Sequence, residues 1–86
     1  MDRVAEIRRR LTEAYHPSRL EIEDQSHLHA GHAGARQSGG GHFAVNITSI
    51  AFAGSSAVQR HRMVYEALGD LMDREIHAVS VRACER

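Results

Sequence analysis

Two short segments of alternating apolar and polar residues flank a long stretch without periodicity, and this arrangement limits the possible folds most. The alternating apolar positions are Leu20 and Ile22 before the stretch and Phe43, Val45 and Ile47 after it. Residues two apart lie on one face of a strand, so both segments predict strands with one buried face. The stretch itself, 25–41, holds five Gly and three His. We therefore predict an antiparallel hairpin with a long loop, which in a small domain is usually functional or mobile.

A first helix is predicted ahead of the hairpin. Ile7 and Leu11 fall at helical spacing, Asp2 is a suitable N-cap, and Pro17 ends the pattern. The run 8–10 consists of arginine only. It is either a phosphate-binding patch or, as such runs usually are, a solvated helix face.

A second helix and a third strand follow the hairpin. An apolar stripe at helical spacing runs from Ala57 to about Arg74, and Ser55 or Ser56 can cap its start. This stripe predicts one helix of about sixteen residues. The stretch 76–84 alternates again and predicts a strand. One face of that strand is expected to carry His77, Val79, Val81 and Ala83.

The element order helix–strand–strand–helix–strand predicts an α+β fold. A helical crossover between the second and third strands normally makes them parallel, with a right-handed connection. The chain should therefore form two layers, a three-stranded mixed sheet with both helices packed on one face. Its 86 residues fit a single domain over 1–86.

Composition and charge exclude several functions. The net charge is zero, which argues against attachment to nucleic acid or to anionic membranes by bulk charge. No apolar run approaches the length of a membrane span, so no membrane partner is expected. The single cysteine excludes an internal disulfide framework and suits a reducing cytosol. Together with the use of Arg without Lys, it leads us to expect a cytoplasmic bacterial protein.

Catalytic motifs receive little support from the sequence. Ser55 and Ser56 are not surrounded by a nucleophile elbow. Cys84 has no His beside it in the sequence, and the glycines 39–41 are not followed by the Lys of a P-loop. We therefore expect neither enzymatic activity nor a small-molecule substrate.

The seven histidines are unevenly distributed, and they are the main candidates for chemistry. His27, His29 and His32 fall within the loop, and imidazole binds zinc, iron, copper and nickel. No Cys, Asp or Glu lies among them, so the spacing alone favours a solvated loop over a preformed metal site. His61 is expected to be a core residue with hydrogen-bonded ring nitrogens. His77 is expected at the rim of the sheet, where its side chain can be anchored and still reach outward.

Several segments resemble the BolA family. The run from Phe52 to Tyr65, with Phe-Ala-Gly-Ser-Ser and Arg-His-Arg, is similar to that family's signature, and Ile76-His77-Ala78 is similar to its closing strand. Ser26-x-x-His29 and His42-Phe43 are similar to the two ends of its loop. The combination at these spacings is specific and covers nearly the whole chain.

The resemblance implies a class II KH-like fold and a non-enzymatic role with iron and sulfur. Members of the family pair with monothiol glutaredoxins and share a two-iron two-sulfur cluster with the glutaredoxin cysteine and glutathione. The family's ligand positions fall here on His29 and His77. No cluster is then expected in the isolated chain, and the function would be cluster trafficking or iron and redox regulation.

Departures from the family pattern keep some alternatives open. Ser38-Gly39-Gly40-Gly41 replaces the acidic residue that many members carry before the His-Phe pair. His27 and His32 could act as additional metal ligands, and His61 could orient the loop or His77. The residue at 29 is His rather than Cys, which places the chain in the His-type branch.

Two further functions follow from other features. The family also includes transcriptional regulators, and Arg60 and Arg62 on the second helix could contact DNA. The Gly-x-x-Gly loop by which KH-like folds usually bind nucleic acid is absent at the matching place. A small metal-scavenging module that uses the histidine loop is the third hypothesis.

Overall fold

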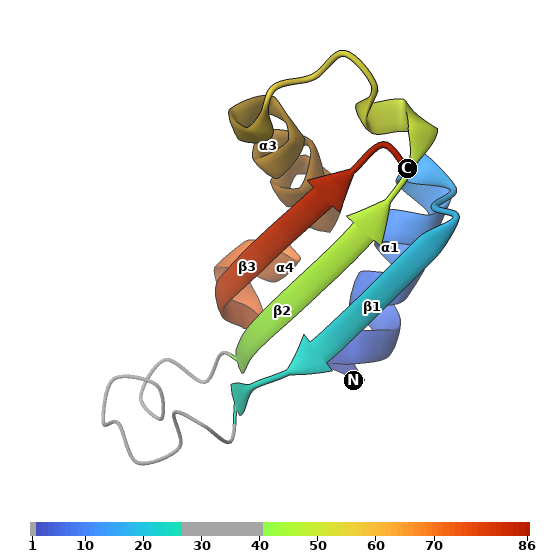
Figure 1. The fold of residues 1–86 in the computed structure, drawn as a ribbon. Helices are drawn as coiled ribbons and strands as arrows, with labels where there is room; N and C mark the ends of the chain where they lie inside the picture. The colour runs from blue at the N-terminus through green and yellow to red at the C-terminus, as the bar shows by residue number, and fades with distance from the viewer. Residues whose placement is uncertain (1, 27–40) are drawn as a thin grey trace.

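The protein, represented by a computed structural model that describes residues 2–26 and 41–86, has two layers (Figure 1). In chain order the elements are α1 (Arg3–Tyr15), β1 (Arg19–Asp24), β2 (Gly41–Thr48), the short 3-10 helix η2 (Ile50–Phe52), α3 (Ala57–Leu68), α4 (Leu71–Arg74) and β3 (Ile76–Cys84). The strands form one layer, and the helices lie behind it. The predicted α+β fold and its element order are confirmed.

The three strands form one mixed sheet in the order β1-β2-β3. β1 pairs with β2 antiparallel, as predicted for the hairpin, with Ile22 opposite Val45. β2 pairs with β3 parallel, as predicted from the helical crossover, with Val45 opposite Val81. The central strand is therefore β2, and β1 and β3 form the two edges.

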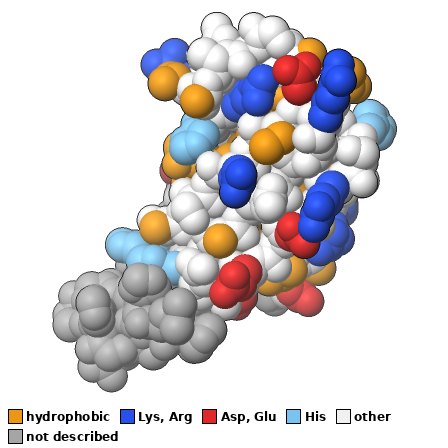
Figure 2. Space-filling view, in the orientation of Figure 1, with side chains coloured by type: hydrophobic (Ala, Val, Ile, Leu, Met, Phe, Trp, Pro, Cys, Tyr) orange, Lys and Arg blue, Asp and Glu red, His pale blue; other side chains and the backbone are white. Residues whose placement is uncertain are grey.

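One face of the sheet carries the hydrophobic core. The fully or nearly fully buried apolar residues are Ile7, Leu11, Phe43, Val45, Ile47, Phe52, Val64, Leu68, Leu71 and Ile76. Most of them come from α1 and α3 and from alternate positions of β2, which explains the period-two pattern in that strand, and the others come from η2, α4 and the start of β3. The opposite face has no helix over it and faces the viewer in Figure 2. None of the helices in 2–26 and 41–86 is long and apolar enough to cross a membrane.

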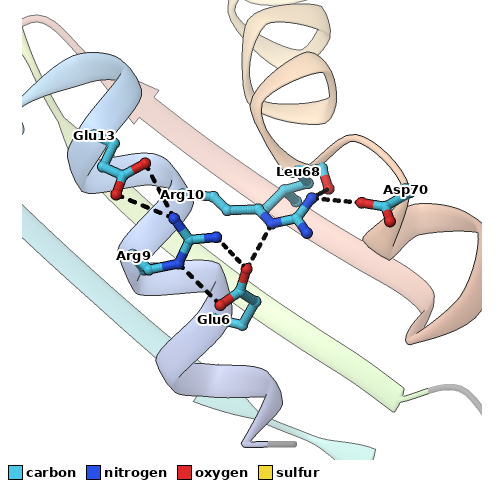
Figure 3. A network of polar contacts seen from close by, with 6 residues as sticks. All are labelled: Glu6, Arg9, Arg10, Glu13, Leu68 and Asp70. Atoms are coloured by element: carbon cyan, nitrogen blue, oxygen red, sulfur yellow. Dashed lines mark hydrogen bonds and ion pairs between the residues drawn. The ribbon is translucent and has the colours of Figure 1, made fainter.

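Helix α1 is stabilised by ion pairs along its surface (Figure 3). Glu6 accepts hydrogen bonds from Arg9 (3.0 Å) and Arg10 (2.9 Å), and Arg9 also donates to Glu13 (3.0 Å). The hydrogen bonds from Arg9 and then from Arg10 lower the pKa of Glu6 from 4.5 to about 2. Two of the three arginines of the run, Arg9 and Arg10, therefore belong to a surface ion-pair network, which agrees with the solvated-face interpretation.

The second helix is shorter than predicted. Ser56, one of the two predicted caps, begins α3, and the structure adds a capping box that includes Gln59. A single helix to about Arg74 is wrong, because α3 ends at Leu68 and Gly69 takes a φ of +53°. Glycine tolerates this left-handed conformation, and α4 begins after it. The apolar stripe continues across the break because Leu71 of α4 is buried in the same core.

The break between α3 and α4 is tied to α1 by one arginine. Arg10 Nη1 donates to the Leu68 carbonyl (2.8 Å) and to the Asp70 carboxylate (2.7 Å), as Figure 3 shows. The hydrogen bond from Arg10 lowers the pKa of Asp70. A carbonyl left open by the end of α3 is thus satisfied by a side chain from another helix.

Candidate functional site

Two imidazole rings meet where β2 and β3 begin. His42 and His77 are the second residues of their strands, and the starts of parallel neighbours lie side by side. The ring centroids are 5.0 Å apart, and the ring planes are inclined by 42°. His77 is exposed and His42 is half-buried. Figure 2 shows histidine side chains gathered at this end of the molecule.

A β-bulge sets the direction of the His77 side chain. Gly41 pairs with Ile76 and His42 pairs with Ala78, so His77 is an extra residue in β3 at this point. His77 and Ala78 are both exposed, although successive strand residues normally point to opposite faces. The expectation that His77 shares the face of the later half-buried residues of β3 is therefore wrong. The extra residue breaks the alternation, and the ring approaches His42 instead.

The described residues on either side of 27–40 meet beside this histidine pair. The His42 N–H donates to Ser26 Oγ (3.1 Å), and the Gln25 N–H donates to the His42 carbonyl (2.7 Å). A Cβ on Gly41 would lie 2.7 Å from Ser26 Oγ and 2.6 Å from a carbon of the neighbouring phenylalanine ring. Only glycine fits there without a shift of these neighbours. Gly41 therefore allows Ser26 to lie directly against the start of β2.

The loop histidines His27, His29 and His32 lie outside the described residues, and their assignment as ligands stays a prediction. Within 2–26 and 41–86, no group of three or more His, Cys, Asp or Glu is arranged to hold a metal ion. Cys84 lies at the opposite end of β3 from His77. The described part of this site therefore offers imidazole nitrogen and no thiolate.

His61 occupies a different place from the one predicted. It is exposed rather than part of the core, because it lies on the side of α3 that borders the edge of β3. Its Nε2 lies 3.0 Å from the Val81 carbonyl, and its ring centroid lies 6.2 Å from that of Tyr65. A carbonyl only accepts, so the hydrogen bond requires a hydrogen on Nε2. The expected hydrogen bonding is present, but its partner is β3 near Val81.

The two arginines of α3 differ in their contacts. Arg60 is largely buried at 20% side-chain exposure and donates to the carbonyls of Ser55 (3.0 Å) and Ala83 (3.1 Å). It also lies 3.9 Å from Glu85. Arg62 is exposed. Arg60 is therefore engaged in holding α3 to the end of β3, which leaves Arg62 as the better-placed residue for an external phosphate.

Sequence reasoning missed His42 as a member of the site. It matched a family motif in the sequence, but no periodicity pointed to a neighbour. The usable signal was the prediction that the second and third strands are parallel, because parallel strands begin at the same edge of a sheet. His42 and His77, each one residue into its strand, could have been paired on that basis.

Comparison with known proteins agrees with this fold. A family model described as BolA-like protein matches residues 11–85. SufE-like protein 1 of Arabidopsis thaliana, chloroplastic/mitochondrial, is 44% identical over 81 residues, which are 90% of this chain and 22% of that protein. Protein BOLA1, chloroplastic, of the same plant is 42% identical over 82 residues, covering 93% of this chain and 51% of that protein.

A solved structure supports the same assignment. The BolA domain of SufE1 from Arabidopsis thaliana superimposes with a TM-score of 0.84 at 40% identity, covering 98% of this chain and 92% of that domain. The family match extends over most of the sequence. The chain therefore belongs to the BolA family, and the resemblance inferred from its motifs is confirmed.

Proposed function

We propose that this protein is a non-enzymatic partner of a monothiol glutaredoxin, with which it holds a two-iron two-sulfur cluster for cluster trafficking or for iron and redox regulation. In this proposal His77 and His29 supply the imidazole ligands. The observation that carries it is the His42–His77 pair, whose rings lie 5.0 Å apart at an exposed end of the sheet. The chain ends that lead to His29 are held at the same place.

The donor set of the chain fits half of such a cluster. Clusters of this type are held by Cys thiolates, and His can replace Cys on one of the two irons. This chain has one cysteine, Cys84, and it lies at the far end of β3 from His77. The remaining ligands must then come from outside the chain. A glutaredoxin cysteine and glutathione supply thiolates, and this complementarity supports a shared cluster over one held by the isolated chain.

His77 is the stronger ligand candidate because its backbone belongs to a strand. The bulge exposes its side chain, and the ring of His42 lies beside it. Contact with a neighbouring ring restricts the orientations of an exposed imidazole, so His42 is assigned to positioning His77. When bound, the cluster supplies an electron-accepting centre, and imidazole ligation raises its reduction potential relative to thiolate ligation alone.

Co-expression with a monothiol glutaredoxin tests the proposal. The mixed complex should have a visible absorption and circular dichroism spectrum distinct from that of the cluster-bound glutaredoxin homodimer. His77→Ala should remove the difference, His29→Ala should reduce it, and His61→Ala, which changes a histidine bound to β3, should leave it nearly unchanged. A mixed sample without a distinct spectrum would refute the shared cluster. A larger effect of His61→Ala than of His77→Ala would refute the ligand assignment.

The alternatives predict different measurements. A DNA-binding regulator requires binding that falls steeply with salt and with Arg62→Ala, because phosphate contacts release counterions. A metal-scavenging module requires zinc or nickel binding by the isolated chain that is lost with the loop histidines His27, His29 and His32. Both can be measured on the isolated protein, before any glutaredoxin is added.

A further inference from the structure

The outer edge of β3 is a strand-pairing surface that the chain itself keeps covered. We infer that side chains of α3 prevent this edge from pairing with β3 of a second copy of the chain. The protein stays monomeric because of these side chains. The inference does not depend on the proposed cluster. It assigns a role to Arg60, His61 and Tyr65, which share one helix and which the histidine site does not use.

The direction of the β3 backbone groups follows from its pairing with β2. The Cys84 carbonyl accepts from the Ser49 N–H (2.9 Å), which directly follows β2, so it points toward β2. The backbone groups of successive strand residues alternate between the two sides of the strand. The carbonyl and N–H groups of Ala83, Val81 and Val79 therefore point to the outer edge, where no further strand of the sheet follows.

Each of these outward carbonyls accepts from one side chain of α3. The pairs are Arg60 Nη1 with Ala83 (3.1 Å), His61 Nε2 with Val81 (3.0 Å) and Tyr65 Oη with Val79 (3.5 Å). One helical turn rises about 5.4 Å, and two strand residues span about 6.6 Å. His61 and Tyr65, one turn apart on α3, can therefore match the carbonyls of Val81 and Val79, and Arg60, the residue next to His61, reaches the following outward carbonyl with its longer side chain. The three contacts occur in reverse order because α3 runs against the strand.

This edge would otherwise favour association. Exposed edge strands present unpaired backbone groups to other chains, and proteins cover, shorten or charge them. β3 is the longest strand, with nine residues against six in β1. The β1 edge is protected differently, by its short length, by the acids Glu21, Glu23 and Asp24, and by Arg8, which donates to the Leu20 carbonyl (3.3 Å). The long β3 edge is instead protected by side chains of α3.

A second copy of the chain matches this edge. In a two-fold antiparallel pairing centred on Val81, Val79 of each copy lies opposite Ala83 of the other, and the outward N–H and carbonyl groups of these residues bond reciprocally. Arg82 then lies opposite Ser80 of the second copy, so no like charges face each other directly. The sequence around Val81 therefore permits pairing, and the α3 side chains are the barrier to it.

The test removes the three donors together, in Arg60→Ala/His61→Ala/Tyr65→Phe. Sedimentation velocity over a concentration series should shift from the monomer to the dimer value for this variant. The unchanged protein and Arg62→Ala, which alters an exposed arginine of the same helix, should remain monomers. Hydrogen exchange should show new protection at the Val79, Val81 and Ala83 amides, and only in the dimer. A folded triple variant that stays monomeric, or association without this protection, overturns the inference.

Two further variants cover the case in which the triple variant does not fold. His61→Ala removes only the central donor and should give a smaller shift toward dimer, whereas His61→Gln keeps a donor and should shift less. Equal behaviour of these two variants, or dimerisation of the unchanged protein through the same amides, contradicts the inference. Adding Ala83→Pro to an associating variant should restore the monomer, because proline removes an outward N–H from an edge strand; persistence of the dimer contradicts the pairing.

Discussion

The two ends of the sheet use polar residues in opposite ways. Where β2 ends, Ser49 is buried at 1% exposure, and its Oγ donates to the Tyr15 carbonyl (2.6 Å) and accepts from the Ala51 N–H (3.1 Å). Where β2 begins, His42 lies beside His77, whose ring is exposed to solvent. Polar groups at the first end connect elements of the fold, and at the second end a polar ring is exposed and is the ligand candidate of the proposed function.

The difference has a physical cause. A buried hydroxyl must be hydrogen-bonded, because leaving it unsatisfied destabilises the fold. At the first end Ser49 caps η2, and the ring of Phe52 in η2 packs against that of Tyr15, with ring centroids 5.2 Å apart. At the end with His77, the imidazole is on an exposed residue, so its ring nitrogens do not have to be satisfied within the fold. Substitutions at the first end should change stability, and substitutions at the second should change partner chemistry.

The largest expected effect is at the buried end, in Phe52→Ala. Phe52 is fully buried, and truncating a buried phenylalanine destabilises by about 3–5 kcal/mol. Urea unfolding should show this loss in the free energy of unfolding. Ile50→Ala is the matched control, because Ile50 belongs to the same short helix but is 77% exposed, and it should change stability by less than about 0.5 kcal/mol. Equal effects of the two would break the comparison.

Ser49→Ala should have the next largest effect. It removes one donor and one acceptor from a buried position and leaves the Tyr15 carbonyl without that bond, a loss of about 1–3 kcal/mol. Ser18→Ala serves as the control, because the Ser18 hydroxyl is on an exposed residue and lies 3.4 Å from its acceptor on Thr48. Urea midpoints measured side by side should separate the two variants. A Ser49→Ala protein as stable as the unchanged one would show that this end is not held by its hydroxyl.

A smaller effect is expected in the helix layer, away from both ends of the sheet. The pKa of Glu6 is lowered from 4.5 to about 2 by its bonds with Arg9 and Arg10, so ionised Glu6 stabilises the folded state above about pH 4.5. That contribution disappears as the pH falls toward 2. Unfolding measured over this range should show a shallower pH dependence in Glu6→Gln than in the unchanged protein. Added salt should reduce the difference, because these groups are on the surface; identical pH profiles would contradict it.

The topology was predictable because it depends on local patterns. The alternation of Phe43, Val45 and Ile47, the caps at Asp2 and Ser56, and the helical crossover each follow from short-range rules, and they gave the hairpin, the helix starts and the parallel pairing. The end of α3 was missed because the apolar stripe continues through Gly69 into another helix. Periodicity shows which residues reach the core. It does not show that the chain turns into a second helix when the residues of both helices are buried in the same core.

The site was harder to predict because it depends on one extra residue. The period-two pattern of 76–84 gave no indication that pairing slips between Gly41 and His42. That slip breaks the alternation at His77 and brings its ring beside His42. His61 was misplaced for a related reason: a helix stripe shows which positions lie inward, but its margin can border a strand edge instead of the core. A bulge and a covered strand edge both depend on neighbouring elements, so the pattern of one segment does not reveal them.

His77→Ala should have the smallest effect on stability and the sharpest effect on function. The side chain is exposed, so urea unfolding should change by less than about 0.5 kcal/mol. The spectrum of the mixed complex with glutaredoxin should nevertheless lose its distinct features. Ser49→Ala should behave in the opposite way, with lower stability and an unchanged spectrum below its unfolding range. If His77→Ala instead lowers stability as much as Ser49→Ala does, the imidazole stabilises the fold. The contrast between a structural end and a partner-binding end of the sheet would then be wrong.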